Sequence, residues 1–181
     1  LFIPHNMIAG LPDDYKENHL QADGKYAIDL SYPSFYPFMI YAESDSLRKL
    51  LRYMFLNKGM PQNVSILSEI LANRKSLAEL LNYPSFSALI IDQGMAKSTE
   101  AVWEFEKDLI EKIQPKANWD TKQLLQLKYD TIEGNDKTIT DWQKDYYENQ
   151  LLLKKHRVDS EEVKQYFQVD NVIEGLFAIF S

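Results

Sequence analysis

The chain has 181 residues, 45% of them hydrophobic, and a formal net charge of −7. This length and composition suit a folded protein with a sizeable core, and the acidic balance of 27 Asp and Glu against 20 Lys and Arg argues against binding to a nucleic-acid backbone. No apolar run approaches the roughly 20 residues of a membrane span, and there is no cysteine, so we expect a soluble, cytoplasmic protein that binds neither nucleic acid nor membrane.

The first regular element that the sequence predicts is a short strand over residues 25–31. Tyr26, Ile28 and Leu30 alternate there with polar residues, which is the period of a half-buried strand. We therefore expect one or two short β-strands in this neighbourhood and little strand elsewhere.

An aromatic stretch with two prolines follows the predicted strand. Its rings could stack a peptide or a sugar, or they could fill a protein core; they include Phe35, Tyr36, Phe38 and Tyr41. Because Pro37 restricts the backbone and the spacing continues into a helix that faces a core, we favour core packing for most of them. A membrane anchor is the weakest interpretation, since Glu43 and Asp45 follow at once where a basic flank is needed.

Helical periodicity and capping signals dominate the rest of the chain. An amphipathic pattern begins at Leu47, and further helices are predicted over 61–82, from Ser85 to Gly94, and from Ser98 or Thr99 until Pro115 interrupts. The pattern resumes at Lys116 and a turn is predicted at 133–137. Three more helix starts are predicted at Thr140 with Gln143, at Asp159 with Glu162, and at Asp170. The fold class is therefore mainly α, with seven or so helices.

The last predicted helix has an unusually wide apolar face and no C-terminal stop signal. We expect this face to pack against further parts of the same polypeptide; its apolar residues near the end are Leu176, Phe177, Ile179 and Phe180. The chain then reads as a fragment of a larger protein.

No catalytic, cofactor-binding or metal-binding residue is predicted in this chain. His5, His19 and His156 are too far apart in sequence for two imidazoles to share one helix face. His19 lies near four acidic residues, which favours solvated surface over a metal site; these are Asp13, Asp14, Glu17 and Asp23. Neither a phosphate-binding glycine loop nor a GxSxG nucleophile turn is present.

Several segments together resemble the thimet-oligopeptidase family of zinc metallopeptidases. They follow the family order over nearly all 181 residues: "AGLPDDY" (9–15), the strand, aromatic stretch and Arg-bearing helix (25–55), "QNVSILSEILANRKSLAELLNYPSFSAL" (62–89), "GMAKSTEAVWEFEKDL" (94–109), "TDWQKDYYENQL" (140–151) and "VKQYFQVDNVIEGLFAIFS" (163–181). Three positions depart from the usual family pattern, in which Asn82 is Gly, Ser87 is Ala and Gln168 is Pro.

The resemblance implies that residues 1–181 form a single helical part of a larger peptidase, beside a channel for short peptides. The family's zinc site, HExxH with a later Glu, would lie downstream, so the resemblance implies zinc in the parent protein and none held by this chain. We expect the parent to hydrolyse peptide bonds, by endopeptidase or dipeptidyl-carboxypeptidase action, and this chain alone to be inactive. The alternative is a stand-alone helical module that binds a protein or peptide without catalysis.

Overall fold

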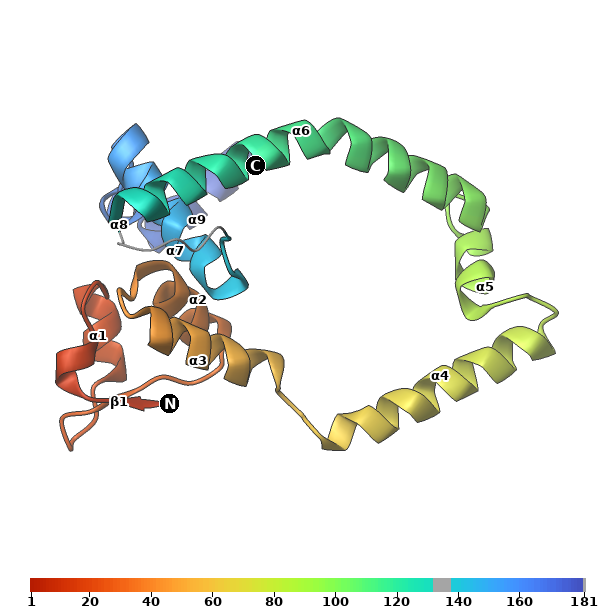
Figure 1. Cartoon of the computed structure of the whole chain (residues 1–181), viewed down its shortest axis with the longest axis horizontal. Helices are drawn as coiled ribbons and strands as arrows, with labels where there is room; N and C mark the ends of the chain where they lie inside the picture. Colours follow the sequence, from red (N-terminus) through yellow and green to blue (C-terminus); the bar gives the residue numbers. More distant parts are fainter. Residues whose placement is uncertain (132–137, 181) are drawn as a thin grey trace. The chain divides into compact units, whose positions relative to one another are not determined.

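The computed structural model describes residues 1–131 and 138–180, and the turn predicted at 133–137 lies outside this range. The described residues are mainly α-helical, as the sequence predicts. The α-helices are α1 (Asp13–His19), α2 (Tyr32–Tyr41), α3 (Asp45–Leu56), α4 (Gln62–Leu80), α5 (Phe86–Gln93), α6 (Thr99–Thr131), α7 (Asp141–Leu151), α8 (Ser160–Lys164) and α9 (Val169–Phe180) (Figure 1). A 3-10 helix, η1 (His5–Met7), precedes α1, and a π-helix, η2 (Leu152–His156), follows α7.

The chain divides into two compact units. Unit 1 contains residues 1–55 and 123–181, and unit 2 contains residues 56–122. Unit 1 holds the small sheet and most of the buried residues, whereas unit 2 consists of α4, α5 and the first two-thirds of α6.

The strand predicted at 25–31 is real but shorter than expected. It forms β2 (Tyr26–Ala27), which pairs antiparallel with β1 (Phe2–Ile3), so that Ile3 lies opposite Tyr26. Ile28 extends the pairing, because its N–H donates to the Leu1 carbonyl at 2.8 Å. A two-residue partner strand is too short to show a period of two, so the sequence did not indicate β1.

The core of unit 1 forms where the aromatic stretch meets α3 and the small sheet. Phe35 and Phe38 are fully buried, and Phe35 stacks on Phe55 of α3 with ring centres 3.9 Å apart. Leu51 of α3 is also fully buried against them. The prediction of core packing is therefore right for both phenylalanines, whereas Tyr36 is 46% exposed.

The aromatic stretch is itself a helix, α2, and not merely an entrance to the next one. Ser31 precedes the helix in an extended conformation, and Pro33 lies in its first turn, where its missing N–H is not needed. Pro37 lies inside the helix without ending it. Burial of the apolar face of α2 thus outweighs the local preference of the second proline.

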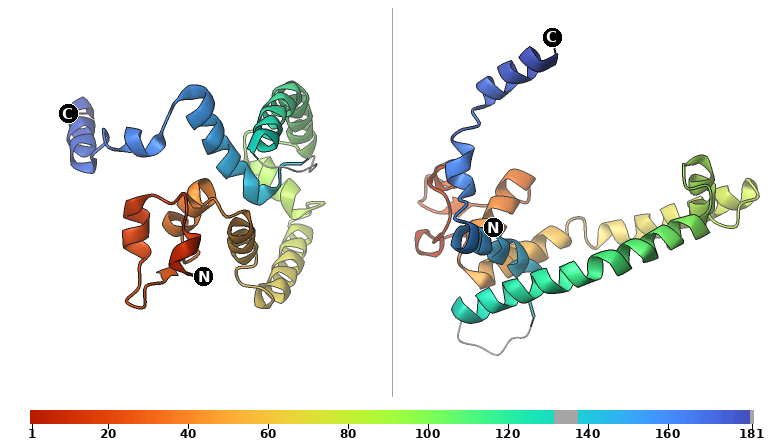
Figure 2. Two further views of the ribbon diagram at one scale, coloured as in Figure 1. Left: turned by 60° about the vertical axis from the view of Figure 1, so that its left-hand side comes forward. Right: turned by 90° about the horizontal axis from the view of Figure 1, so that it is seen from above.

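The prediction that Pro115 interrupts a helix is wrong. Helix α6 runs through Pro115 as one element of 33 residues, and the right view of Figure 2 shows it without a break. Pro115 can leave only the carbonyl of Glu111 without its helical partner, and both residues are exposed, so water can hydrate that carbonyl. Ion pairs on either side support the helix, one from Lys112 to Asp108 at 2.6 Å and one from Lys116 to Asp120.

The end of α4 explains why Asn replaces the Gly usual in the family at position 82. Asn82 has φ +60°, in the left-handed region that favours glycine and that asparagine tolerates best among the other residues. The Tyr83 N–H donates to the Ala78 carbonyl at 2.9 Å and the Asn82 N–H donates to that of Glu79 at 3.1 Å. This is the Schellman pattern that ends a helix.

The predicted starts of α5, α7 and α8 are confirmed. The Ser85 hydroxyl accepts from the Ala88 N–H at 3.1 Å, and the Asp159 carboxylate accepts from the Glu161 N–H at 2.9 Å. At α7, Thr140 and Gln143 have the capping-box arrangement, in which the Thr140 N–H donates to Gln143 Oε1 at 3.2 Å, whereas no described residue hydrogen-bonds with the Thr140 hydroxyl. Each signal lies within four residues, so it can be recognised without knowledge of tertiary contacts.

Unit 2, all of whose residues are described, has little core of its own. Its buried hydrophobic residues are Ala78 and Leu89, whereas apolar residues of α4 such as Leu67 and Leu71 are more than half exposed. Helices with this composition ordinarily bury an apolar face. Unit 2 thus presents more apolar surface than a self-contained domain does.

A pair of glycines in unit 1 permits a matched stability test. Gly10 and Gly24 have φ of +84° and +79°, but a Cβ at Gly10 would overlap the Tyr41 carbonyl oxygen, whereas a Cβ at Gly24 has no atom within 4 Å. We expect Gly24→Ala to lower the free energy of unfolding by about 1 kcal/mol, because alanine is strained in this conformation. Gly10→Ala should lower it by about 2 kcal/mol more, because its Cβ also clashes with the Tyr41 oxygen. Urea unfolding followed by circular dichroism measures both; equal losses would contradict this account.

Candidate functional site

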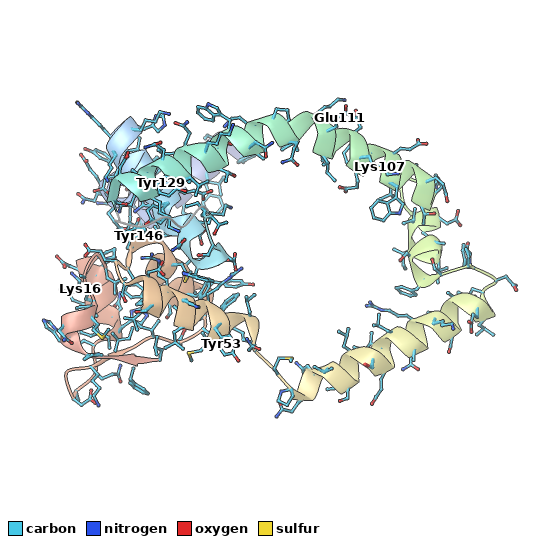
Figure 3. The ribbon with its side chains drawn as sticks, in the orientation of Figure 1. Lys16, Tyr53, Lys107, Glu111, Tyr129 and Tyr146 are labelled. Atoms are coloured by element: carbon cyan, nitrogen blue, oxygen red, sulfur yellow. The ribbon has the colours of Figure 1, made fainter. Side chains whose placement is uncertain are left out.

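A buried arginine on α3 organises the most polar site of unit 1. Arg48 is 2% exposed, and its guanidinium donates to the carbonyls of Ala42, Glu43 (3.1 Å) and Trp142 (3.2 Å). Its guanidinium carbon also lies 4.1 Å from the ring centre of Tyr146 on α7. Tyr146 is labelled in Figure 3. One side chain thereby joins the end of α2, the start of α3 and the start of α7.

Asp45 completes this arrangement from the first turn of α3. One carboxylate oxygen accepts from Arg48 Nη2 at 3.0 Å and from Gln143 Nε2 at 2.9 Å, and the other accepts from Trp142 Nε1 at 3.2 Å. Lys128 of α6 joins through Gln143, whose Oε1 accepts from Lys128 Nζ at 3.0 Å. The network therefore links segments that lie more than ninety positions apart in the sequence.

The electrostatics of the site follow from burial and opposite charge. Burial lowers the pKa of the Arg48 guanidinium, and the Asp45 carboxylate opposes this effect. Burial also raises the pKa of the Tyr146 phenol, while the nearby Arg48 charge lowers it. A small cavity of about 170 Å³ lies beside Arg48 and Asp45, and Glu43, Thr131 and Gln150 form part of its lining.

The arrangement holds helices together more readily than it binds a ligand. The Arg48 donors point at carbonyl and carboxylate oxygens of the protein, and so they are already engaged. Arg48 was predicted on the polar side of the amphipathic helix, and its burial was missed. The local signal for it is the pair Asp45 and Arg48, three positions apart, which places both side chains on one face.

The histidines do not come together. His19 uses both ring nitrogens, since Nδ1 lies 2.7 Å from the Tyr15 carbonyl oxygen and Nε2 lies 2.8 Å from Ser34 Oγ. His5 Nδ1 lies 3.0 Å from the Tyr26 hydroxyl, and His156 is exposed. Across residues 1–131 and 138–180, no three His, Cys, Asp or Glu residues are grouped so that they could hold a metal ion.

Three of the four acidic residues near His19 pair with a lysine or cap a turn. Lys16 pairs with Asp13 at 2.8 Å, and Lys164 of α8 pairs with Asp14 at 2.7 Å, whereas Asp23 caps the turn that leads to Lys25. The described residues therefore do not fit a zinc site, because the imidazole that lies near these acids is already bound within the protein. The sequence prediction of no catalytic or metal-binding residue in this chain stays a prediction.

Fold and site together define the class of this protein: a mainly helical scaffold tied by a buried ion-pair network. The chain belongs to peptidase family M3, whose family model matches residues 38–181. This confirms the resemblance to the thimet-oligopeptidase family. No described helix is both long and apolar enough to cross a membrane.

Relatives from several kingdoms agree with this assignment. The chain is 30% identical over 159 residues to saccharolysin of Saccharomyces cerevisiae, covering 86% of this chain and 22% of saccharolysin. It is 30% identical to the thimet-like oligopeptidase of Dictyostelium discoideum, covering 85% of this chain and 24% of that protein. It is 28% identical to oligopeptidase A of Haemophilus influenzae, and the match covers 95% of this chain and 27% of that protein. The chain thus spans about a quarter of the length of these relatives.

Proposed function

We propose that this chain is a helical, channel-forming part of a zinc-dependent oligopeptidase of the cytoplasm that hydrolyses peptide bonds in short peptides. The observation that carries the proposal is the family match over residues 38–181. The relatives, which are saccharolysin and oligopeptidases, support a peptidase as the parent.

The zinc ligands of the parent would come from outside these 181 residues. This part of the proposal is supported by the local contacts of His5 and His19, which fit structural roles, and by the relatives' greater length. The contribution of this chain is then to shape and support the path that a peptide takes to the catalytic centre.

The apolar end of α9 gives the proposal a partner surface. Leu176, Phe177, Ile179 and Phe180 are 52%, 65%, 79% and 81% exposed. We infer that the remainder of the same polypeptide covers this face, because soluble proteins seldom leave so large an apolar row in water and the relatives are about four times longer than this chain. The apolar surface of unit 2 supports the same inference.

The same exposed face also suits the alternative, a helical module that binds another protein without catalysis. The two functions differ in one measurable property, because only the peptidase consumes a peptide. A test of cleavage by the full-length protein therefore separates them.

We expect the full-length protein to cleave a quenched fluorescent peptide of roughly ten residues and to lose this activity almost completely after treatment with a chelator. We expect the 181-residue chain to show no cleavage above background and to retain no stoichiometric zinc after dialysis. Fluorescence assays and metal analysis by mass spectrometry measure both. A full-length protein without any cleavage would reject the peptidase, and a zinc-retaining, active chain would reject the placement of the catalytic residues elsewhere.

A further inference from the structure

A second cavity in unit 1 lies apart from the Arg48 network and has a different character. It has a volume of about 340 Å³ and is formed by α2, α7, η2 and α8. Two tyrosines and an isoleucine of α2 line one side, namely Tyr36, Ile40 and Tyr41. The volume lies at the lower end of the range for ligand pockets and is sufficient for one large side chain.

The opposite wall of the cavity is acidic. Asp145 and Glu148 lie three positions apart on α7, so that both carboxylates share one face of the helix. Glu148 pairs with Lys144 at 3.6 Å, whereas none of the described cations pairs with Asp145. Asp145 is half-buried, so its charge is less screened than a fully exposed one.

A buried amide supplies an independent indication of a ligand. Asn149 lines the same cavity from the next turn of α7 and is 6% exposed, yet no residue of the described chain hydrogen-bonds with its side chain. Buried amides are almost always hydrogen-bonded, because an unsatisfied one costs about 1–3 kcal/mol. The Asn149 amide keeps some access to the cavity, so it can hydrogen-bond to water there or to a ligand group that enters.

The local potential also favours a positive charge. Burial and the carboxylates of Glu161 and Asp159 raise the pKa of the Tyr41 phenol to about 12, while Lys164 acts in the opposite direction. Lys164 is itself paired with Asp14 and Glu161 at 2.7 Å, which leaves the surroundings of the cavity acidic. A cation placed here meets Asp145, and the ring of Tyr36 can add a cation–π contact.

We propose that the cavity between α2 and α7 binds the charged end of an arginine or lysine side chain in a peptide. Asp145 would pair with the cation, the Asn149 carbonyl oxygen would accept one of its N–H groups, and Tyr36 and Ile40 would contact its aliphatic stem. A negatively charged or purely apolar side chain would leave Asn149 or Asp145 without a suitable partner. The inference rests on the proposed function, since it names a class of peptide that the parent would prefer.

The test uses the full-length protein with quenched peptides of about eight residues. Each pair of peptides differs only in arginine or citrulline at one position, and that position is moved along the peptide. Citrulline keeps the shape but lacks the charge. We expect one position at which kcat/KM is about tenfold higher for the arginine peptide than for its citrulline counterpart. The difference should arise mainly from a lower KM. Its size corresponds to one charge-assisted hydrogen bond. Asp145→Asn should lower activity on that arginine peptide by about tenfold and change activity on the citrulline peptide less than twofold. Asn149→Leu should lower activity on both peptides, because citrulline keeps the N–H groups that the Asn149 carbonyl oxygen would accept.

Glu106→Gln is the matched control, since it removes one exposed carboxylate from α6 in unit 2 and should leave both peptides unchanged. An Asp145→Asn protein that loses thermal stability but keeps the same arginine preference would overturn the inference and indicate that a basic residue of the polypeptide itself fills the cavity.

If the full-length protein cleaves no peptide, the proposed function fails, and fluorescence anisotropy of a labelled arginine peptide then tests whether the cavity binds a cation. Binding weakened about tenfold by Asp145→Asn would then support the cavity as a cation site, and unchanged binding would reject it.

Discussion

Replacing Arg48 by Ala is expected to lower the free energy of unfolding of unit 1 by about 3–5 kcal/mol, because a fully buried side chain that donates to several oxygen atoms is lost and leaves a cavity. The substitution leaves Asp45 without its cation and removes the donor that serves the carbonyls of Ala42, Glu43 and Trp142. It also opens a space under Tyr146. Because these groups belong to α2, α3 and α7, the loss should weaken contacts across the whole unit.

Urea unfolding measures this effect by far-ultraviolet circular dichroism and by tryptophan fluorescence, to which Trp142 at the network contributes. Arg52→Ala is the control, since Arg52 lies one turn further along α3 and pairs with Asp141 in a more exposed position. An exposed pair contributes about 0–1 kcal/mol. Equal losses for Arg48→Ala and Arg52→Ala would show that the buried network is not what joins α3 to α7.

Replacing Phe35 by Ala is expected to cost about 3–5 kcal/mol of unfolding free energy, the range for truncating a buried aromatic ring. Phe35 is fully buried and stacks on Phe55, so its removal leaves a cavity between α2 and α3. The cost contains both the lost transfer of the ring from water and the contacts that its neighbours lose.

Tyr36→Ala provides the comparison within the same helix turn. Tyr36 is 46% exposed, so its truncation should cost about 1 kcal/mol or less. Thermal and urea unfolding of both variants give the difference directly. A loss at Tyr36 as large as that at Phe35 would mean that the aromatic stretch acts as one packed cluster and not as a core face with an exposed side.

The candidate sites were hardly visible in the sequence. Arg48 and Lys49 are neighbours in an amphipathic helix and look equally suited to a solvated face, yet Arg48 is buried and Lys49 is exposed. Which of these two cations becomes buried is decided by contacts with α7, where the Trp142 carbonyl accepts from Arg48 and Gln143 donates to Asp45. These α7 residues follow Arg48 by more than ninety positions. Likewise, the cavity that contains Asn149 exists only because α2 packs beside α7.

The sequence by itself determined the mainly helical class, the membership of a peptidase family, and the helix starts at Ser85, Thr140 and Asp159. The helical class and the helix starts depend on residues within one or two turns of each other, where side-chain capping and apolar periodicity act directly on the backbone. The family membership depends instead on the order of several segments along the chain. Only the tertiary structure decided that α6 continues through Pro115, that Phe2–Ile3 becomes a strand, and that Arg48 is buried. In each case distant groups or solvent satisfy polar atoms that local sequence leaves open, and the free energy of burial and pairing across the fold exceeds the local preference.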